Sequence, residues 1–322
     1  MSPTNSDFVT APFFSIIMPC FNSEEYLEGS IRSVLDQAER DFELIIVDDG
    51  SADNSRGIVQ TLALADPRIK LVRNSGESGA GGARNYGVSL SRGEWLCFLD
   101  SDDQYVTEAL SRRKALIRNH SECQFFSSDF LLWSDQSEDG NISQTESNEF
   151  WAFYFRQAGK QGLHLLTDAV IAIFVEAPLA WTGGVSMKRE LFVELGGFDE
   201  TLTRAEDDHL WVRAAAKAGV VGLINHVDVY YRLRSSGLSQ GGGSLTPYTP
   251  IMIKKLMRDP LLAGFQKQLR RKLELETYIL SLHYRSNGAR KFAIRYAFES
   301  YLLSCLNYQK LRNLIGALLL KS

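Results

Sequence analysis

Three carboxylates stand within four residues in the segment Leu99-Asp100-Ser101-Asp102-Asp103, directly after the apolar run Trp95–Leu99. Asp100 and Asp102 are two positions apart, so in extended backbone both side chains point the same way and can converge on one cation. Mg²⁺ and Mn²⁺ prefer oxygen ligands, and Mg²⁺ is usually held by one or two carboxylates together with phosphate oxygens and water. The D-x-D pattern therefore indicates half of a metal site that a diphosphate would complete.

Acidic doublets are also common in solvated loops, and two further acidic clusters carry the same ambiguity. Asp48-Asp49 precede Gly50-Ser51, where they form either a turn with a helix cap or a contact to a ribose or a base. Glu206-Asp207-Asp208 open a predicted helix, where they either complement the helix dipole or supply a general base. The residues alone leave both alternatives open.

A glycine-rich segment, Gly79-Ala80-Gly81-Gly82-Ala83-Arg84-Asn85, predicts a helix start whose backbone N–H groups, with Arg84 nearby, can approach a phosphate closely. Its spacing is not the G-x-x-x-x-G-K-[ST] of a Walker loop. It also lacks the close strand that precedes a dinucleotide fingerprint.

The elements that must position these residues alternate between strands and helices. Short apolar runs that predict buried strands are Phe13–Met18, Phe42–Val47, Ile69–Val72 and Trp95–Leu99. Helical patterns follow each run, and Asn22 with Glu25 predicts a cap for the first helix. This alternation predicts a parallel sheet covered by helices, and it puts the polar clusters at the carboxyl edge, where such sheets bind ligands.

Later segments predict the rest of the domain and a helical tail. The polar segment 131–148 predicts a loop, Lys188–Leu195 and Ala205–Ala218 predict helices, and Val220–Ile224 and Val227–Tyr231 predict two short strands. We therefore expect one domain over residues 1–238, a linker over 239–250 that contains a Gly-rich run, and a basic helical region over 251–322.

Composition bounds the class of protein. The chain has 322 residues, 44% of them hydrophobic and 23% charged, which is typical of a globular protein. Its cysteines form no C-x-x-C pair, so neither a zinc site nor a disulfide framework is indicated, and a reducing cytoplasm fits best. The N-terminus lacks signal-peptide character, and no apolar run approaches the roughly 18 residues of a membrane span.

Charge is distributed unevenly along the chain. Residues 251–322 hold 14 Lys or Arg and 4 Asp or Glu, a balance of +10, whereas the remainder is −14 and the whole chain −4. The tail therefore predicts either a contact with an anionic partner such as a membrane surface, or a helical subdomain with a solvated basic face. Helix packing or a contact between homo-oligomer subunits explains the same residues, and we expect no nucleic acid partner.

Four segments resemble, in order, the conserved blocks of family 2 glycosyltransferases with the GT-A fold, over roughly residues 13–238. They read SIIMPCFNSEEYL, ELIIVDDGSAD, GGARNYGVSLSRGEWLCFLDSDD and WTGGVSMKRELFVELGGFDETLTRAEDDHLWVRAAAKAG. The resemblance implies an α/β fold with a Rossmann-like, mostly parallel sheet flanked by helices, here followed by the C-terminal helical segment. It also implies inverting transfer of a hexosyl or N-acetylhexosaminyl group from a nucleotide diphosphate sugar, with a UDP-sugar expected, to a glycan or lipid-linked hydroxyl, assisted by Mn²⁺ or Mg²⁺.

The family's functional positions can be carried over residue by residue. Asp207 matches the general base of the family. The positions that match the donor side are Pro19, Glu25, Asp49, Arg84, Asp100 and Ser101. The positions that match the metal site are Asp102, Asp100 and Asp103. The positions near the donor sugar and the acceptor are Gly183, Gly184 and Glu206.

Two departures refine what the resemblance implies. Where many relatives carry a histidine in a Y-R-x-H-like segment, this chain has Arg234, which cannot bind a cation, so a third protein ligand is not expected from that position. The Q-x-x-R-W block of processive synthases is absent, which favours transfer of a single sugar. The alternatives are a sugar-phosphate nucleotidyltransferase and a non-catalytic nucleotide-sugar-binding module. We expect a cytoplasmic enzyme, peripheral on the inner membrane face if the basic tail docks there.

Overall fold

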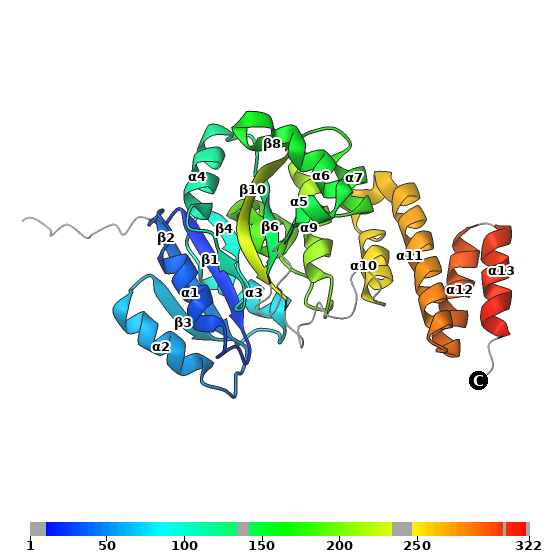
Figure 1. Cartoon of the computed structure of the whole chain (residues 1–322), viewed down its shortest axis with the longest axis horizontal. Coiled ribbons are helices and arrows are strands. Elements are labelled where there is room, and N and C mark those ends of the chain that lie inside the picture. Colours follow the sequence, from blue (N-terminus) through cyan, green and yellow to red (C-terminus); the bar gives the residue numbers. More distant parts are fainter. Residues whose placement is uncertain (1–10, 134–141, 234–246, 305–306, 320–322) are drawn as a thin grey trace, which may run out of the picture.

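A ten-stranded sheet organises the first two thirds of the chain in the computed structural model, which describes residues 11–133, 142–233, 247–304 and 307–319 (Figure 1). Its strand order is β3-β2-β1-β4-β9-β6-β10-β5, with β7 paired to β6 and β8 paired to β10. The strands are β1 (Phe14–Cys20), β2 (Phe42–Asp48), β3 (Ile69–Arg73), β4 (Trp95–Phe98), β5 (Gln104–Tyr105), β6 (Phe125–Trp133), β7 (Ile142–Ser143), β8 (Leu163–Leu166), β9 (Val185–Lys188) and β10 (Val221–Arg232).

Helices flank this sheet, and a helical region follows it (Figure 1). The first α-helices are α1 (Leu27–Leu35), α2 (Ser55–Ala65), α3 (Ala80–Leu90), α4 (Ala109–Asn119), α5 (Gln144–Ser147), α6 (Glu149–Phe155) and α7 (Val170–Glu176). The later ones are α8 (Arg189–Leu195), α9 (Glu206–Ala218), α10 (Tyr248–Leu256), α11 (Gln266–Ser286), α12 (Arg290–Leu303) and α13 (Tyr308–Leu318). Short 3₁₀ helices are η1 (Arg156–Gln161), η2 (Thr182–Gly184) and η3 (Pro260–Phe265).

The first half of the sheet is parallel, and its strands β1 and β2 are buried on both faces. β1 pairs in parallel with both β2 and β4, and β2 pairs in parallel with β3. Ile16, Ile17 and the run Leu44–Val47 are fully buried. Such strands need helices on their faces to exclude water. β9 is antiparallel to its neighbours β4 and β6, whereas β10 is parallel to β6. The predicted α/β class with a mostly parallel, helix-flanked sheet and C-terminal helices is confirmed.

The predicted cap of the first helix is wrong. α1 begins at Leu27, and Asn22 lies outside it in a left-handed conformation with φ of 48°. The Asn22 side-chain oxygen instead accepts a hydrogen bond from the backbone N–H of Ala52 at 2.8 Å. The side chain therefore joins the loops that follow β1 and β2, which sequence spacing along one helix cannot reveal.

Two further predictions need correction in the second half of the sheet. β10 is one strand with register shifts around Val227, where two short strands were expected. Part of the expected loop 131–148 is regular, because β6 extends to Trp133 and Ser143 forms a capping box with Glu146 at the start of α5. Residues 134–141 of that segment lie outside the described residues.

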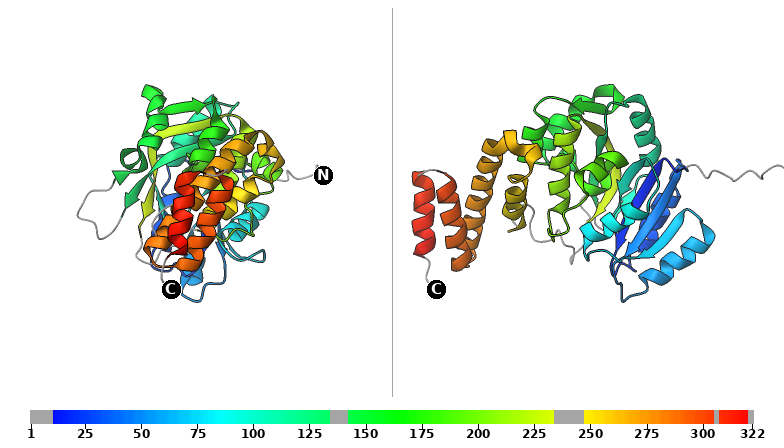
Figure 2. Two further views of the ribbon diagram at one scale, coloured as in Figure 1. Left: turned by 90° about the vertical axis from the view of Figure 1, so that its right-hand side faces the viewer. Right: turned by 180° about the vertical axis from the view of Figure 1, so that it is seen from behind.

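The C-terminal helices divide between two apolar clusters. α10, η3 and the first half of α11 contribute Met252, Ile253, Leu262 and Leu273 to the main core. α12 and α13 form a separate small cluster around Ala293, Ala297 and Ala317. Figure 2 shows these two helices at the end of the molecule farthest from the sheet. Most of the predicted linker lies outside the described residues, and α10 begins inside its last positions.

None of the helices in the described ranges is both long and apolar enough to cross a bilayer. The domain boundaries expected from the sequence stay predictions. The three described cysteines, Cys20, Cys97 and Cys123, are free and buried.

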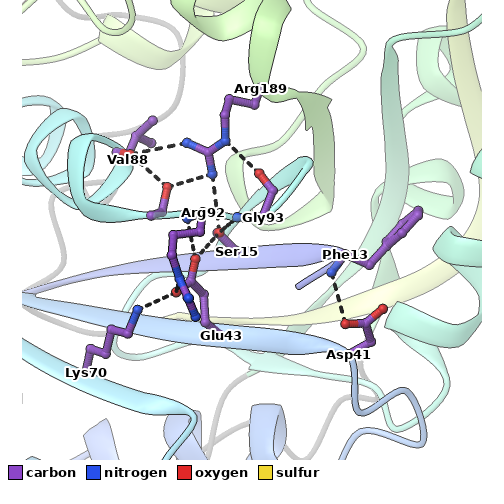
Figure 3. A network of polar contacts seen from close by, with 10 residues as sticks. Phe13, Ser15, Asp41, Glu43, Lys70, Val88, Arg92, Gly93 and Arg189 are labelled. Atoms are coloured by element: carbon purple, nitrogen blue, oxygen red, sulfur yellow. Dashed lines mark hydrogen bonds and ion pairs between the residues drawn. The ribbon is translucent and has the colours of Figure 1, made fainter. Parts of the chain in front are cut away.

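A buried polar network joins the strands at the edge where β1, β2 and β3 begin (Figure 3). Glu43 at the start of β2 is 3% exposed, and its carboxylate accepts from Ser15 Oγ at 2.7 Å and from Lys70 Nζ at 2.6 Å. Arg189 at the start of α8 donates to the carbonyl of Gly93 at 2.6 Å, which attaches that helix to the same network. Burial favours the neutral acid, but these hydrogen bonds outweigh it and lower the pKa of Glu43.

We expect Glu43→Gln to lower the free energy of unfolding by about 2 kcal/mol at pH 7, because the variant loses a charge-assisted bond with Lys70. Since folding lowers the pKa of Glu43, its stabilisation is present above the unfolded pKa of about 4.3 and is lost as the pH falls. Urea unfolding at several pH values measures both effects. Glu122→Gln, at an exposed glutamate, is the control. A stability difference that does not change between neutral and acidic pH would contradict this assignment.

Candidate active site

The predicted polar clusters meet at the opposite edge of the sheet, where β1, β2 and β4 end. The N–H of Leu99 donates to the Ile17 carbonyl at 3.1 Å, and the N–H of Asp49 donates to the Cys20 carbonyl at 2.8 Å. These bonds carry the strand pairing beyond the strand ends. The segments that begin at Pro19, Asp49 and Asp100 therefore leave the sheet side by side, as expected for a parallel sheet.

The D-x-D segment forms a tight turn after β4. The N–H of Asp103 donates to the carbonyl of Asp100 at 3.1 Å, and Ser101 between them is buried, with its Oγ 2.7 Å from Ser23 Oγ. Asp100 and Asp102 are half-buried, whereas Asp103 is 1% exposed. The turn thus leaves two of its three carboxylates partly accessible to solvent.

Arg84 on α3 joins this turn to the start of α9. Its guanidinium donates to Asp100 Oδ1 at 2.6 Å through one terminal nitrogen, and to Glu206 Oε1 at 3.0 Å through the other. The Arg84 side chain is 5% exposed. Burial opposes the charged form, but the two carboxylates outweigh it and raise the pKa of Arg84 above its ordinary value. Arg84 therefore stays cationic between two carboxylates that lie 16 and 122 positions away from it in the sequence.

Gly81 allows α3 to approach α9 this closely, and Gly82 allows the loop before α3 to pack against that helix. A Cβ on Gly81 would lie 3.2 Å from Glu206 Cγ, and one on Gly82 would lie 2.0 Å from the carbonyl oxygen of Glu77. The Arg84 guanidinium also lies 5.4 Å from the centroid of the Phe198 ring. The Gly-rich segment thus has a packing role at these two positions. Its predicted approach to a phosphate stays a prediction.

Asp207 is held from two sides. Thr182 Oγ1 donates to its Oδ2 at 3.1 Å, and the N–H of Asp208 donates to its Oδ1 at 2.9 Å. Ala205, directly before α9, adopts a left-handed conformation with φ of 60°, a strained geometry that only the surrounding contacts can maintain. These contacts hold the Asp207 carboxylate in place at the start of α9.

Negative charge is concentrated at the start of α9. Burial and then Asp207 raise the pKa of Glu206, although Arg84 opposes them. Burial, Asp207 and Glu206 together raise the pKa of Asp208 well above its ordinary value. One turn on, burial and then Arg213 lower the pKa of His209 to about 4, so this buried histidine is neutral at pH 7 and packs rather than titrates.

The Gly183-Gly184 loop connects Asp207 to the D-x-D turn. A Cβ on Gly183 would lie 3.8 Å from Leu99 Cδ1, and one on Gly184 would lie 2.7 Å from the Ser128 carbonyl oxygen. The Gly183 carbonyl accepts from Arg113 at 3.0 Å, and Arg113 in turn pairs with Asp228 at 2.9 Å; both residues are fully buried. This buried ion pair fixes the loop that carries Thr182.

The residues predicted to lie on the nucleotide side differ in their hydrogen-bond partners and exposure. Asp49 accepts hydrogen bonds from Asn74 Nδ2 at 2.6 Å and from the N–H of Gly79 at 2.8 Å, so it links the ends of β2 and β3 to the start of α3. Asp48 accepts from the N–H of Ser51 at 3.0 Å, which matches the turn alternative for that residue. Glu25 is exposed and, among the described residues, has no hydrogen bond or ion pair.

Arg232 at the end of β10 was not singled out by sequence reasoning. Its backbone N–H donates to Asp103 Oδ1 at 2.9 Å, and its Nε donates to the Asp102 carbonyl at 3.1 Å. Its guanidinium lies 3.8 Å from the Trp133 ring centroid and 4.6 Å from that of Tyr26. The Y-R-x-H-like segment contains both Arg232 and Arg234, so it was the available signal for Arg232. Arg234 itself lies outside the described residues.

The donor set fits a divalent cation that is shared with a ligand. Within the described ranges, no three His, Cys, Asp or Glu side chains are arranged to hold a metal ion by themselves. Asp100 and Asp102 instead offer hard oxygen donors at the partly exposed side of the turn. Mg²⁺ sites often have this form, with phosphates and water completing the shell.

Comparisons with known proteins match part of this chain to one family. Residues 15–171 match the family model described as Glycosyl transferase family 2. Over 103 residues the chain is 41% identical to the Escherichia coli protein WfgD, named as a UDP-Glc:alpha-D-GlcNAc-diphosphoundecaprenol beta-1,3-glucosyltransferase; the match covers 32% of this chain and 40% of WfgD. This chain spans half or less of the length of several curated relatives that it matches.

Solved structures are similar over almost the whole chain. Staphylococcus aureus TarS 1-349 in complex with UDP-GlcNAc has a TM-score of 0.65 at 18% identity, over 94% of this chain and 88% of that chain. The mannosyltransferase PcManGT from Pyrobaculum calidifontis, in complex with GDP-Man and Mn²⁺, has a TM-score of 0.58 at 17% identity, over 96% and 87%. At these identities the likeness establishes the fold.

We expect Arg84→Met to lower the free energy of unfolding by about 3 kcal/mol at pH 7, because it leaves two carboxylates facing each other without their cation. The deficit should shrink as the pH falls, since burial and Asp207 already raise the pKa of Glu206 and protonation removes its charge. Denaturant unfolding at pH 7 and at several lower pH values measures this deficit in the free energy of unfolding. Arg118→Met, at an exposed arginine on α4, serves as the control. A deficit that is constant with pH would rule out carboxylate repulsion as its cause.

Proposed function

Residues 15–171 of this chain belong to glycosyl transferase family 2, and from this premise we propose that the protein transfers a sugar from a nucleotide diphosphate sugar to a hydroxyl group. The acceptor is a glycan or a lipid-linked saccharide, and the reaction belongs to polysaccharide or glycoconjugate biosynthesis. Two names support a UDP-sugar donor, because WfgD is named for UDP-Glc and a diphosphoundecaprenol-linked acceptor, and TarS was solved with UDP-GlcNAc. We expect the transferred group to be a hexosyl or N-acetylhexosaminyl group, and we expect the protein to act in the cytoplasm.

The Arg84 bridge is the observation that carries this proposal. It holds Asp100 of the D-x-D turn and Glu206 of the α9 start on one guanidinium, with Asp207 adjacent to Glu206. A general base and a site for the leaving diphosphate have to flank the same anomeric carbon for a displacement to occur. The bridge between these two remote segments supports such an arrangement.

Asp207 acts as the base in this proposal. Its carboxylate takes the proton of the acceptor hydroxyl as the hydroxyl oxygen bonds to the anomeric carbon and the bond to the diphosphate breaks. Thr182 is a positioning residue, because its hydroxyl orients the Asp207 carboxylate. Attack opposite the leaving group inverts the anomeric centre in a single displacement, so a covalent nucleophile is unnecessary.

Asp100 and Asp102 are the pair that we propose for the metal. A bound Mg²⁺ or Mn²⁺ would neutralise charge on the leaving diphosphate. Asp103 is buried and accepts from the Arg232 backbone, so we propose a supporting role for it instead of the predicted metal contact. Pro19, Glu25, Asp49 and Ser101 stay proposed donor contacts, and we propose that Gly183 and Gly184 lie near the donor sugar and the acceptor.

A panel of nucleotide sugars with a panel of acceptors tests the proposal. We expect metal-dependent release of a nucleoside diphosphate. Release of pyrophosphate from a nucleoside triphosphate would favour a nucleotidyltransferase, and donor binding without turnover would favour a non-catalytic module. A thermal-shift screen of the donors with Mn²⁺ present narrows the panel first, since a bound donor raises the melting temperature.

Asp207→Asn should retain donor affinity and lose turnover by about 10²- to 10⁴-fold, because the amide keeps the size of the side chain but cannot accept the proton. Steady-state kinetics and donor titration separate the two quantities. Asp168→Asn, at an exposed carboxylate outside the acidic start of α9, is the control and should stay within a few-fold of wild type. Near-normal turnover of Asp207→Asn would disprove the base assignment.

Asp102→Asn should weaken donor binding by at least about tenfold in the presence of Mn²⁺, and much less in its absence. Calorimetric titration of the nucleoside diphosphate with and without the metal measures this difference. Asp168→Asn, at an exposed carboxylate remote from the turn in sequence, controls for the change in net charge. An equal loss of affinity with and without metal would mean that Asp102 contacts the donor directly.

A further inference from the structure

Helices α12 and α13 expose large apolar side chains on their outer sides. On α12, Phe298 and Leu302 are 51% and 58% exposed, whereas the half-exposed Phe292 stacks on Tyr284 of α11. On α13, Tyr308, Ile315 and Leu319 at its end are 47–76% exposed. Phe298 and Leu302 are four residues apart on α12, and Tyr308, Ile315 and Leu319 are seven and four residues apart on α13, so each group shares one side of its helix. We call these five residues the outer face.

The outer face takes no part in holding the helices together. The inner sides pack through the small residues Ala293, Ala297 and Ala317. Asn313 on the inner side of α13 hydrogen-bonds to Ser281 of α11. The helical end lies away from the sheet and from the candidate active site (Figure 2). The outer face is therefore an apolar surface that the described part of the chain leaves uncovered.

Basic residues are interspersed with this apolar surface. Lys291, Arg295 and Arg312 are exposed, and none of them forms an ion pair with a described residue. Between residues 285 and 319 the sequence contains one acidic residue, Glu299, and Lys254 already pairs with it. The surface thus combines apolar side chains with positive charge that the protein itself does not neutralise.

The sign of this charge decides between two occupants. A second copy docked through the same face would add its own exposed arginines to one interface, and residues 285–319 offer no carboxylate to compensate them beyond Glu299, which Lys254 already pairs. An anionic lipid surface supplies the missing negative charge and accepts the apolar side chains below the headgroups. We propose that the outer face of α12 and α13 docks on the surface of an anionic lipid bilayer, with both helices lying along it.

Vesicle sedimentation of the full-length chain tests this docking independently of sugar transfer. We expect binding to vesicles of phosphatidylcholine with phosphatidylglycerol, little binding to phosphatidylcholine alone, and weaker binding as salt is added. The double variant Phe298→Ser, Leu302→Ser should lower the partition coefficient by about tenfold or more. The double variant Arg295→Glu, Arg312→Glu should lower it by a similar factor, since each basic residue contributes about fivefold.

Matched controls come from the sheet domain. Leu64→Ser replaces an apolar side chain that is 92% exposed on α2, and Arg118→Glu reverses an exposed charge on α4. Both should bind vesicles as the wild type does, and thermal unfolding by circular dichroism verifies that every variant is folded. Equal binding to both vesicle types, or unchanged binding by the two outer-face variants, would overturn the proposal. So would a dimer in multi-angle light scattering that the apolar substitutions dissociate, which would assign the face to a second copy.

Discussion

One buried guanidinium sets the geometry on which the candidate site depends. Arg84 lies between Asp100 and Glu206, and neither carboxylate could stay partly buried next to the other without a cation between them. The bridge therefore fixes the distance between the end of β4 and the start of α9. Everything proposed about proton removal and diphosphate departure requires that distance to be constant, because chemistry at one carbon tolerates little displacement of its groups.

The backbone accommodates this bridge through residues that lack bulk or have unusual conformations. Gly81 permits α3 to approach Glu206, Gly183 leaves no room for a side chain beside Val229, and Ala205 takes positive φ directly before the acidic turn of α9. Each feature lies where two elements of the site meet. A strained residue such as Ala205 is typical of positions whose geometry serves function more than stability.

The sequence predicted what depends on local pattern, and it missed what depends on contacts between distant segments. Near-continuous apolar strands identified the parallel sheet and placed Asp100 at its ligand edge, and the motif order singled out Arg84 and Asp207. It could not show that Arg84 joins Asp100 to Glu206, because that contact spans 122 residues. The same limitation explains the wrong cap at Asn22, whose partner Ala52 belongs to another loop, and the oversight of Arg232 behind the D-x-D turn.

Acidic side chains at the two edges of the sheet have pKa values shifted in opposite directions. This contrast distinguishes an acid that stabilises the fold from acids at the candidate active site. At the edge where the strands begin, Glu43 is saturated with donors, and its pKa is lowered, so the charge contributes to stability. At the edge where the strands end, Glu206 and Asp208 crowd around Asp207, and their pKa values are raised, so ionising them costs stability. Selection for stability alone would remove such crowding. Its presence beside a partly exposed D-x-D turn argues that these carboxylates are kept for a ligand that brings positive charge or a proton to them.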